Sequence, residues 1–251
     1  MEQETITTPS YYDLDLQQRI SRGLLDLTAS WKVGVQSGAK RKHLVFLALS
    51  YKCFATAKAM QCLCDEGLYD DAFAMLRVIV EGTIDAVYIL KSDDQVAEDY
   101  MDYPKFQAWD QLERIRSVDP QMADYFSPDE QAEMESQYQQ VRARYEGNRN
   151  DDWTKDNLFK RAKFIDTQAF PALMNVTWKD ASAYVHSTAR SIEWRIDASG
   201  VKRSRVATKG EIATIIYYAN AMLFTLLSFL EPMAGKPIEG LKTLYEEWKK
   251  S

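Results

Sequence analysis

Residues 70–90 combine an apolar surface with one regular line of polar positions. Most of the stretch is apolar, but Arg77, Glu81 and Asp85 recur every four residues, and Tyr88 falls close to the same line. On a helix these side chains form a narrow polar stripe. A buried charge is costly unless it is paired or in use. The pattern therefore has two interpretations, a packed helix with an internally satisfied ion pair or one wall of a polar site.

The spacing of apolar residues elsewhere predicts further helices rather than strands. They are expected over residues 13–32, 40–66, 94–117, 128–145, 155–166, 177–196, 208–231 and 236–251. Gly67 is placed to end the 40–66 helix in a left-handed conformation. Because so few residues separate that helix from the 70–90 helix, we expect the two to form an antiparallel hairpin.

Prolines and threonines set several of the expected helix boundaries. We expect Pro104 to kink or break its helix, Pro171 to divide the segments on either side of it, and Pro232 to stop the helix before it. Thr177 and Thr208 each precede a helical stretch and are expected to cap it.

Residues that break regular structure are scarce, with ten glycines and seven prolines in 251 residues. Together with a hydrophobic content of 46%, this favours long helices around a sizeable core. We predict an all-α fold, a multi-helix bundle built on the long antiparallel hairpin. Residues 1–12 are expected to form a disordered tail. Residues 13–251 are expected to form a single all-helical domain, in which 118–150 is a peripheral helical insertion.

The chain is acidic, with a net charge of −6, so it is not a general nucleic-acid binder by overall charge. Local cations nevertheless gather on both sides of a stretch that carries His186. They are Lys155, Lys160, Arg161 and Lys163 before it and Arg195, Lys202, Arg203 and Arg205 after it. Such runs are usually solvated loops, but they can also follow a nucleic-acid backbone.

Compartment and membrane contact are inferred from the cysteines, the N-terminus and one apolar run. The odd cysteine count and a polar N-terminus unlike a secretory leader lead us to expect a cytoplasmic protein. Residues 212–230 carry no charge and are about as long as a membrane span. The central helix of a bundle has the same pattern, and we favour that interpretation over a membrane span.

His186 is the histidine that offers chemistry. Three residues are expected to share its helix face, Ser182, Arg190 and Glu193. An imidazole can move a proton near neutral pH, and a nearby guanidinium can hold a phosphate. The other interpretation is a histidine that is hydrogen-bonded at a helix interface. His43, beside two cations near a helix start, is interpreted as solvated.

Motifs that identify common cofactor and metal sites are missing. The sequence has no glycine-rich dinucleotide loop, Walker A motif, G-x-S-x-G, H-E-x-x-H or Glu-x-x-His pair. The three cysteines, Cys53, Cys62 and Cys64, have no second Cys or His pair nearby. We expect neither a cofactor nor a metal.

The segment AFAMLRVIVEGTIDAVYIL, paired with the later AYVHSTARS, resembles an uncharacterised bacterial domain-of-unknown-function family of all-helical proteins. Such proteins are in turn similar to HEPN domains, helical bundles of bacterial toxins and phage-defence systems. The resemblance implies a metal-independent ribonuclease that acts through an Arg and a His four to six residues apart, assembled across a homodimer. Here no Arg stands at that distance before His186, and Arg190 follows it instead.

The leading hypothesis is a HEPN-like effector that binds or cleaves RNA. His186 would be the general acid and base, Arg190 and Arg77 would hold the scissile phosphate, and Glu81 would orient Arg77. The residues expected to contact the substrate are Tyr184, Ser187, Arg195 and Arg203. Two alternatives are a non-catalytic helical protein-interaction module or regulated subunit, and a membrane-tethered protein that uses residues 212–230.

Overall fold

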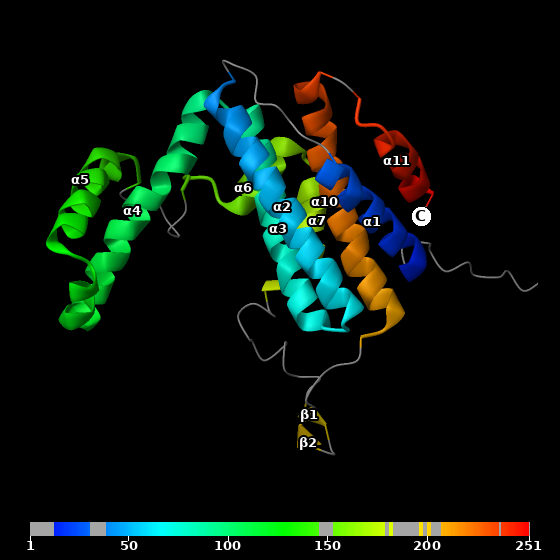
Figure 1. Ribbon diagram of the computed structural model, residues 1–251, viewed down its shortest axis with the longest axis horizontal. Helices are drawn as coiled ribbons and strands as arrows, with labels where there is room; N and C mark the ends of the chain where they lie inside the picture. The colour runs from blue at the N-terminus through cyan, green and yellow to red at the C-terminus, as the bar shows by residue number, and fades with distance from the viewer. Residues whose placement is uncertain are drawn as a thin grey trace, which may run out of the picture.

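The computed structural model describes residues 13–30, 39–145, 153–178, 181–182, 196–197, 200–201, 207–235 and 237–250. Within these ranges the regular structure is helical except for one short strand pair, which confirms the predicted all-α class (Figure 1). The first half contains α1 (Leu14–Ser30), α2 (Arg41–Asp65), α3 (Tyr69–Lys91), α4 (Asp94–Val118), the 3₁₀ helix η2 (Pro120–Tyr125) and α5 (Pro128–Tyr145). The second half contains α6 (Leu158–Ile165), α7 (Ala169–Leu173), the π-helical turn η3 (Met174–Trp178), α10 (Lys209–Ala234) and α11 (Leu241–Lys249).

The described ranges also contain one short pair of strands. β1 (Ile196–Asp197) and β2 (Gly200–Val201) pair antiparallel, with Ile196 opposite Val201. They lie between the helices predicted over 177–196 and 208–231, apart from Ile196, which is the last residue of the first. The predicted tail, residues 1–12, lies outside the described residues.

Helices α2 and α3 form the predicted hairpin and lie side by side along their length (Figure 1). Gly67 ends α2 with a φ of 74°, and the N–H of Leu68 bonds the carbonyl of Leu63 at 2.8 Å. Only glycine adopts this left-handed conformation without strain. Farther along the hairpin, a Cβ on Gly82 would lie 2.7 Å from the Cys53 sulfur. The absence of a side chain at Gly82 thus lets the two helices approach closely.

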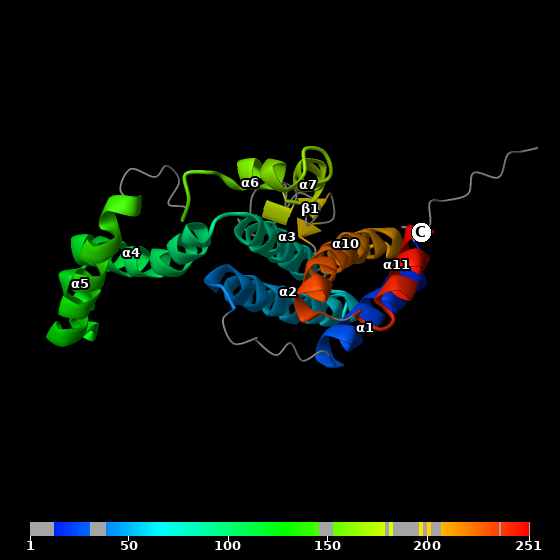
Figure 2. The ribbon, with the colours of Figure 1, turned by 90° about the horizontal axis from the view of Figure 1, so that it is seen from above.

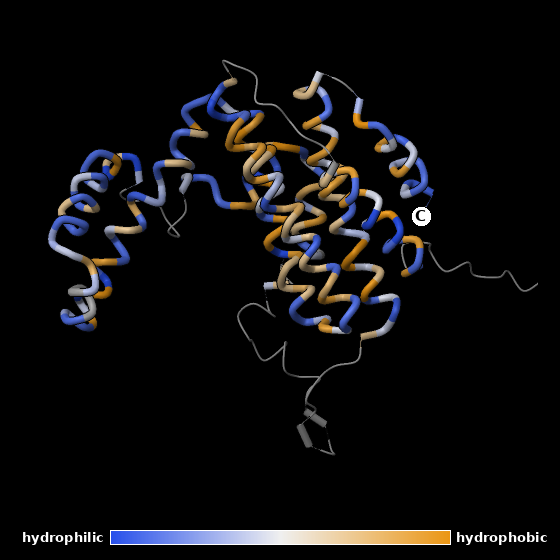
Figure 3. Tube along the Cα trace, viewed as in Figure 1, coloured by the Kyte–Doolittle hydropathy of each residue, from blue (hydrophilic) through white to orange (hydrophobic). Residues whose placement is uncertain are grey.

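Helix α10 is the central apolar element and packs against α1 and α3. It begins with the predicted capping box, in which Thr208 and Glu211 bond each other's backbone N–H groups. Fully buried Asn220 donates to the backbone carbonyl of Gln17 at 3.1 Å, which fixes α1 against α10. Figure 3 shows apolar residues concentrated where these helices meet.

Among the described residues, α10 is the one helix that is long and apolar enough to cross a membrane, and 56% of its apolar window is buried inside the protein. A single such helix is weak support for a membrane span, because the core helix of a bundle has the same length and composition.

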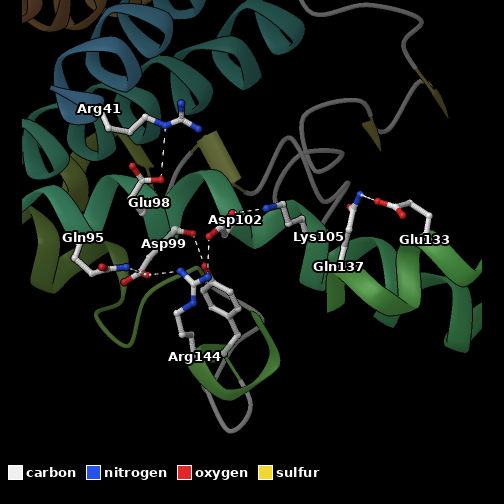
Figure 4. Close-up of polar contacts among 10 residues, drawn as sticks. Arg41, Gln95, Glu98, Asp99, Asp102, Lys105, Glu133, Gln137 and Arg144 are labelled. Atoms are coloured by element: carbon white, nitrogen blue, oxygen red, sulfur yellow. Dashed lines mark hydrogen bonds and ion pairs between the residues drawn. The ribbon is translucent and has the colours of Figure 1, made fainter. Parts of the chain in front are cut away.

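Helices α4 and α5 form an arm that extends away from the other helices (Figure 1). Arg144 of α5 lies between two carboxylates of α4, at 3.1 Å from Asp99 and 2.7 Å from Asp102 (Figure 4). The Tyr145 hydroxyl donates to the carbonyl of Asp99 at 2.5 Å. These contacts hold α5 onto α4. The assignment of residues 118–150 as a peripheral insertion within one domain stays a prediction.

Three proline predictions are corrected in part. Pro104 does not break α4, because ring contacts of Tyr103 and Phe106 with Tyr145 hold the helix on both sides of it. Pro171 does not mark the division; it lies in the first turn of α7, where its missing N–H has no helical partner to lose. Pro232 does not stop α10 either, since the helix continues to Ala234.

Helix α6 ends before Asp166, and Thr177 does not begin a new helix. The Asp166 carboxylate accepts the N–H groups of Gln168 and Ala169 at 2.7 and 2.6 Å, which starts α7. Thr177 lies inside η3, and its hydroxyl donates to the carbonyl of Leu173 at 2.6 Å. Its predicted role as a helix cap is therefore wrong. Most of the helix predicted over 177–196 lies outside the described residues.

Candidate functional site

The polar stripe of α3 faces a layer made of α6, α7 and η3. This layer covers the side of α3 opposite α2 (Figure 2). The four predicted stripe residues do not share one environment. Arg77 and Glu81 lie beside η3, whereas Asp85 and Tyr88 lie beside α6 and the segment that precedes it.

Arg77 and Glu81 form the pair that their spacing predicted. The Nε atom of Arg77 donates to Oε1 of Glu81 at 2.8 Å, and the side chains are 18% and 34% exposed. The indole N–H of Trp178 donates to the same oxygen at 2.5 Å. The guanidinium carbon of Arg77 also lies 5.0 Å from the centre of the Trp178 ring. Cation–π contact and hydrogen bonds together fix the direction of the arginine.

Trp178 reaches this position at the end of a π-helical turn. Such turns are rare and frequently occur at functional sites, because the extra residue re-aims the side chains that follow. After the turn, the Ser182 hydroxyl donates to the Trp178 carbonyl at 2.6 Å, and Ala181 is fully buried. A hydrogen bond thus connects the Arg77–Glu81–Trp178 cluster to Ser182, which precedes His186 by four residues in the sequence.

Asp85 forms a second, more deeply buried ion pair with Arg161 of α6. Their Oδ1 and Nε atoms are 2.8 Å apart, and Arg161 is only 4% exposed. Arg161 also donates to the carbonyl of Asp156 at 2.6 Å and lies 5.2 Å from the Trp153 ring centre. Arg161 was one of the cations suggested to follow a nucleic-acid backbone, and its burial rules out that role.

Tyr88 ends the stripe in an aromatic cluster. Its hydroxyl donates to Asp156 at 3.3 Å, and its ring contacts Trp153 and Phe164 at 6.0 and 5.2 Å. Burial, followed by the charge of Asp156, raises the pKa of Tyr88. Tyr100, whose ring is 5.0 Å from Trp153, has its pKa raised to about 12 by burial. Both phenols stay protonated at neutral pH, and the hydroxyl of Tyr88 acts as a hydrogen-bond donor.

The two ends of the stripe differ in how deeply they are buried. The Asp85–Tyr88 end is an internally paired structural network. The Arg77–Glu81 end is half-buried, has fixed geometry and keeps contact with solvent. A guanidinium in this setting can hold a phosphate or a carboxylate.

Two of the eight predicted site residues, Arg77 and Glu81, lie in described ranges, and the structure brings them together. Six lie outside the described residues, namely His186, Arg190, Tyr184, Ser187, Arg195 and Arg203. Sequence reasoning missed Trp178, although it stands four residues before Ser182 on the face assigned to His186. In the ranges that the structure describes, no three His, Cys, Asp or Glu side chains gather closely enough to hold a metal.

Comparison with known proteins finds one family. Residues 43–202 match a family of unknown function, DUF5677. The matched region runs from α2 to the end of the short strand pair and contains every candidate site residue except Arg203. No curated protein and no solved structure matches the chain.

Proposed function

The chain belongs to the family of unknown function DUF5677, and we propose that it is a HEPN-like helical effector that binds and cleaves RNA without a metal. The Arg77–Glu81–Trp178 cluster carries the proposal. It supplies a partly exposed guanidinium whose direction is fixed by a carboxylate and an indole. A pre-oriented cation of this kind stabilises charge that develops on a phosphate during cleavage.

His186 is related to this cluster by sequence spacing. Trp178, Ser182 and His186 recur every four residues, and the hydrogen bond from Ser182 to the Trp178 carbonyl is typical of helical backbone. Because residues four positions apart share one face of a helix, the proposal takes His186 to lie on the side of Trp178 and Arg77. The proposal joins the two parts of the site in this way.

In the proposed reaction, the neutral imidazole of His186 accepts the proton of a ribose 2′-hydroxyl. The 2′-oxygen then forms a bond to the adjacent phosphorus, and the bond from phosphorus to the 5′-oxygen breaks. The His186 imidazolium then gives up its proton, which protonates the leaving 5′-oxygen, so the imidazole is neutral again and a 2′,3′-cyclic phosphate remains. Arg77 and Arg190 neutralise the charge on the phosphorus oxygens, while Glu81 keeps Arg77 in place. The proposal includes a cytoplasmic homodimer.

The chain contains two histidines, which provide a matched pair of variants. Wild type, His43→Ala and His186→Ala are incubated with single-stranded RNA and a metal chelator. Wild type and His43→Ala should cleave the RNA equally. His186→Ala should lose about 10²-fold or more of the rate, as expected for a general acid or base. Equal rates for wild type and folded His186→Ala would contradict the proposal.

A non-catalytic interaction module is the second candidate. The paired Asp85–Tyr88 end of the stripe and the projecting α4–α5 arm favour it, since Val118 and Tyr125 on that arm are highly exposed apolar side chains. If wild-type protein leaves RNA intact, this candidate replaces the ribonuclease.

A further inference from the structure

Helix α6 has two chemically different faces. Arg161 and Ala162 are buried toward α3, as the ion pair with Asp85 requires. The remaining surface of the helix exposes two phenylalanines and two lysines, Phe159, Lys160, Lys163 and Phe164, which we call the Lys–Phe face. Figure 2 shows α6 at the outside of the bundle, next to α3. Phe159 is 36% exposed and Phe164 is 55% exposed, although phenylalanine is usually buried.

Each lysine of this face stands four residues from a phenylalanine, which is the spacing of neighbours on a helix surface. The Lys163 ammonium lies 5.0 Å from the centre of the Phe159 ring, and Lys160 precedes Phe164 by the same four residues. Lys160 is 61% exposed and only 3.6 Å from Asp156, a pair that contributes little at the surface. Within the described ranges no carboxylate pairs with Lys163. An acidic protein thus presents a local face of exposed lysines and partly exposed aromatic rings.

The Lys–Phe face connects to the candidate site through α3. The Phe164 ring contacts Tyr88 at 5.2 Å, and Arg161 pairs with Asp85, which is one helical turn from Glu81. From Arg77 to Asp85 the distance along α3 is about 12 Å, from the rise per residue of a helix. An RNA strand that occupies both places would need to extend over at least this distance.

We propose that the Lys–Phe face is a subsite for single-stranded nucleic acid, on which unpaired bases stack against Phe159 and Phe164 while Lys160 and Lys163 contact phosphates. The inference rests on the proposed function, since it takes RNA as the ligand of the neighbouring site. Aromatic rings beside lysines are the usual means of binding single strands without sequence preference. A duplex keeps its bases stacked inside, so it cannot use the rings.

The test measures binding separately from cleavage. The probe is a fluorescein-labelled single-stranded 2′-O-methyl RNA of roughly 12 nucleotides, within the usual range of single-strand sites. It has no 2′-hydroxyl and cannot be cleaved by the proposed route. The variant Phe159→Ala/Phe164→Ala should bind about tenfold more weakly or worse, because each stacked base contributes substantially. Phe159→Tyr/Phe164→Tyr should restore binding, since tyrosine also stacks.

The charges are tested by salt dependence. In Lys160→Ala/Lys163→Ala the slope of log affinity against log salt should fall by about 1.4, because each phosphate contact on a single strand contributes about 0.7. The matched control is Lys249→Ala, which removes an ammonium 4.8 Å from the Tyr245 ring on α11. It should leave affinity and slope unchanged.

The outcomes separate this inference from the proposed function. Loss of binding in the α6 variants, with His186→Ala still binding the probe, supports the subsite. Equal binding by wild type and all α6 variants overturns the subsite. Tighter binding of a duplex, made by annealing the same probe to its 2′-O-methyl complement, also overturns it. None of these results depends on cleavage, which is judged by the comparison of His43→Ala with His186→Ala.

Discussion

Replacing Arg161 with methionine tests how the α3 stripe is held. The change leaves the Asp85 carboxylate, itself 15% exposed, without the guanidinium that lies 2.8 Å away. Removing one partner of a buried ion pair destabilises a protein by about 3–5 kcal/mol, because the remaining charge stays buried. The lost hydrogen bond to the Asp156 carbonyl acts in the same direction. We expect a decrease in the free energy of unfolding within this range, measured by urea denaturation with circular dichroism.

Two further variants make that prediction specific. Arg161→Met combined with Asp85→Leu removes both charges and should recover most of the lost stability. Arg19→Met breaks the exposed pair of Arg19 with Glu247 and should change stability by about 1 kcal/mol or less. The reasoning is refuted if Arg161→Met costs no more than Arg19→Met, or if the double variant is less stable than Arg161→Met alone.

Three other results are expected. Gly82→Ala should destabilise the hairpin by about 1–3 kcal/mol, because its Cβ would lie 2.7 Å from the Cys53 sulfur, and adding Cys53→Ala should recover part of the loss in the same denaturation assay. Burial raises the pKa of Cys53 to about 11, so about one thiol in a thousand is ionised at pH 8. Iodoacetamide should therefore alkylate Cys53 only after the protein unfolds. Rapid alkylation of the folded protein, measured by peptide mass, would contradict this. Burial acts to raise the pKa of Asp102, but hydrogen bonds from Lys105 and Arg144 outweigh it and lower the pKa below its usual 3.8. The stabilisation from these bonds is complete above pH 3.8 and is lost as the pH falls through the pKa of Asp102 in the folded protein. Acid should therefore increase proteolysis of α5 in wild type, but less so in Arg144→Ala.

Local spacing predicted the parts of the site that lie on one helix. Arg77 and Glu81 are four residues apart, so their contact follows from helix geometry alone. The helix end at Gly67 and the Thr208–Glu211 capping box could also be predicted, because helix caps depend on residues that are only a few positions apart. The all-helical class followed from the same short-range signals.

Contacts between distant segments could not be predicted in this way. Trp178 joins Glu81 across 97 residues, and nothing near either residue indicates the other. Arg161 was grouped with neighbouring lysines because the sequence does not distinguish a buried cation from exposed ones. Its ion pair with Asp85 of α3 makes it a structural residue, and that contact is between distant segments. Pro104 was overestimated as a breaker for the same reason, since Tyr145 of α5 supports α4 on both sides of it.

The central claim is that His186 shares one site with Glu81, and nuclear magnetic resonance of the two histidines tests it directly. His43 serves as the internal reference, because it lies in the first turn of α2. Its neighbour Lys42 donates to the carbonyl of Ser92, which is about 16 Å along α3 from Glu81. In Glu81→Gln, which removes a charge with little change of shape, the imidazole signals of His186 should move and those of His43 should stay in place. If the His186 signals are the same in both proteins, the two residues do not share a site and the account is wrong.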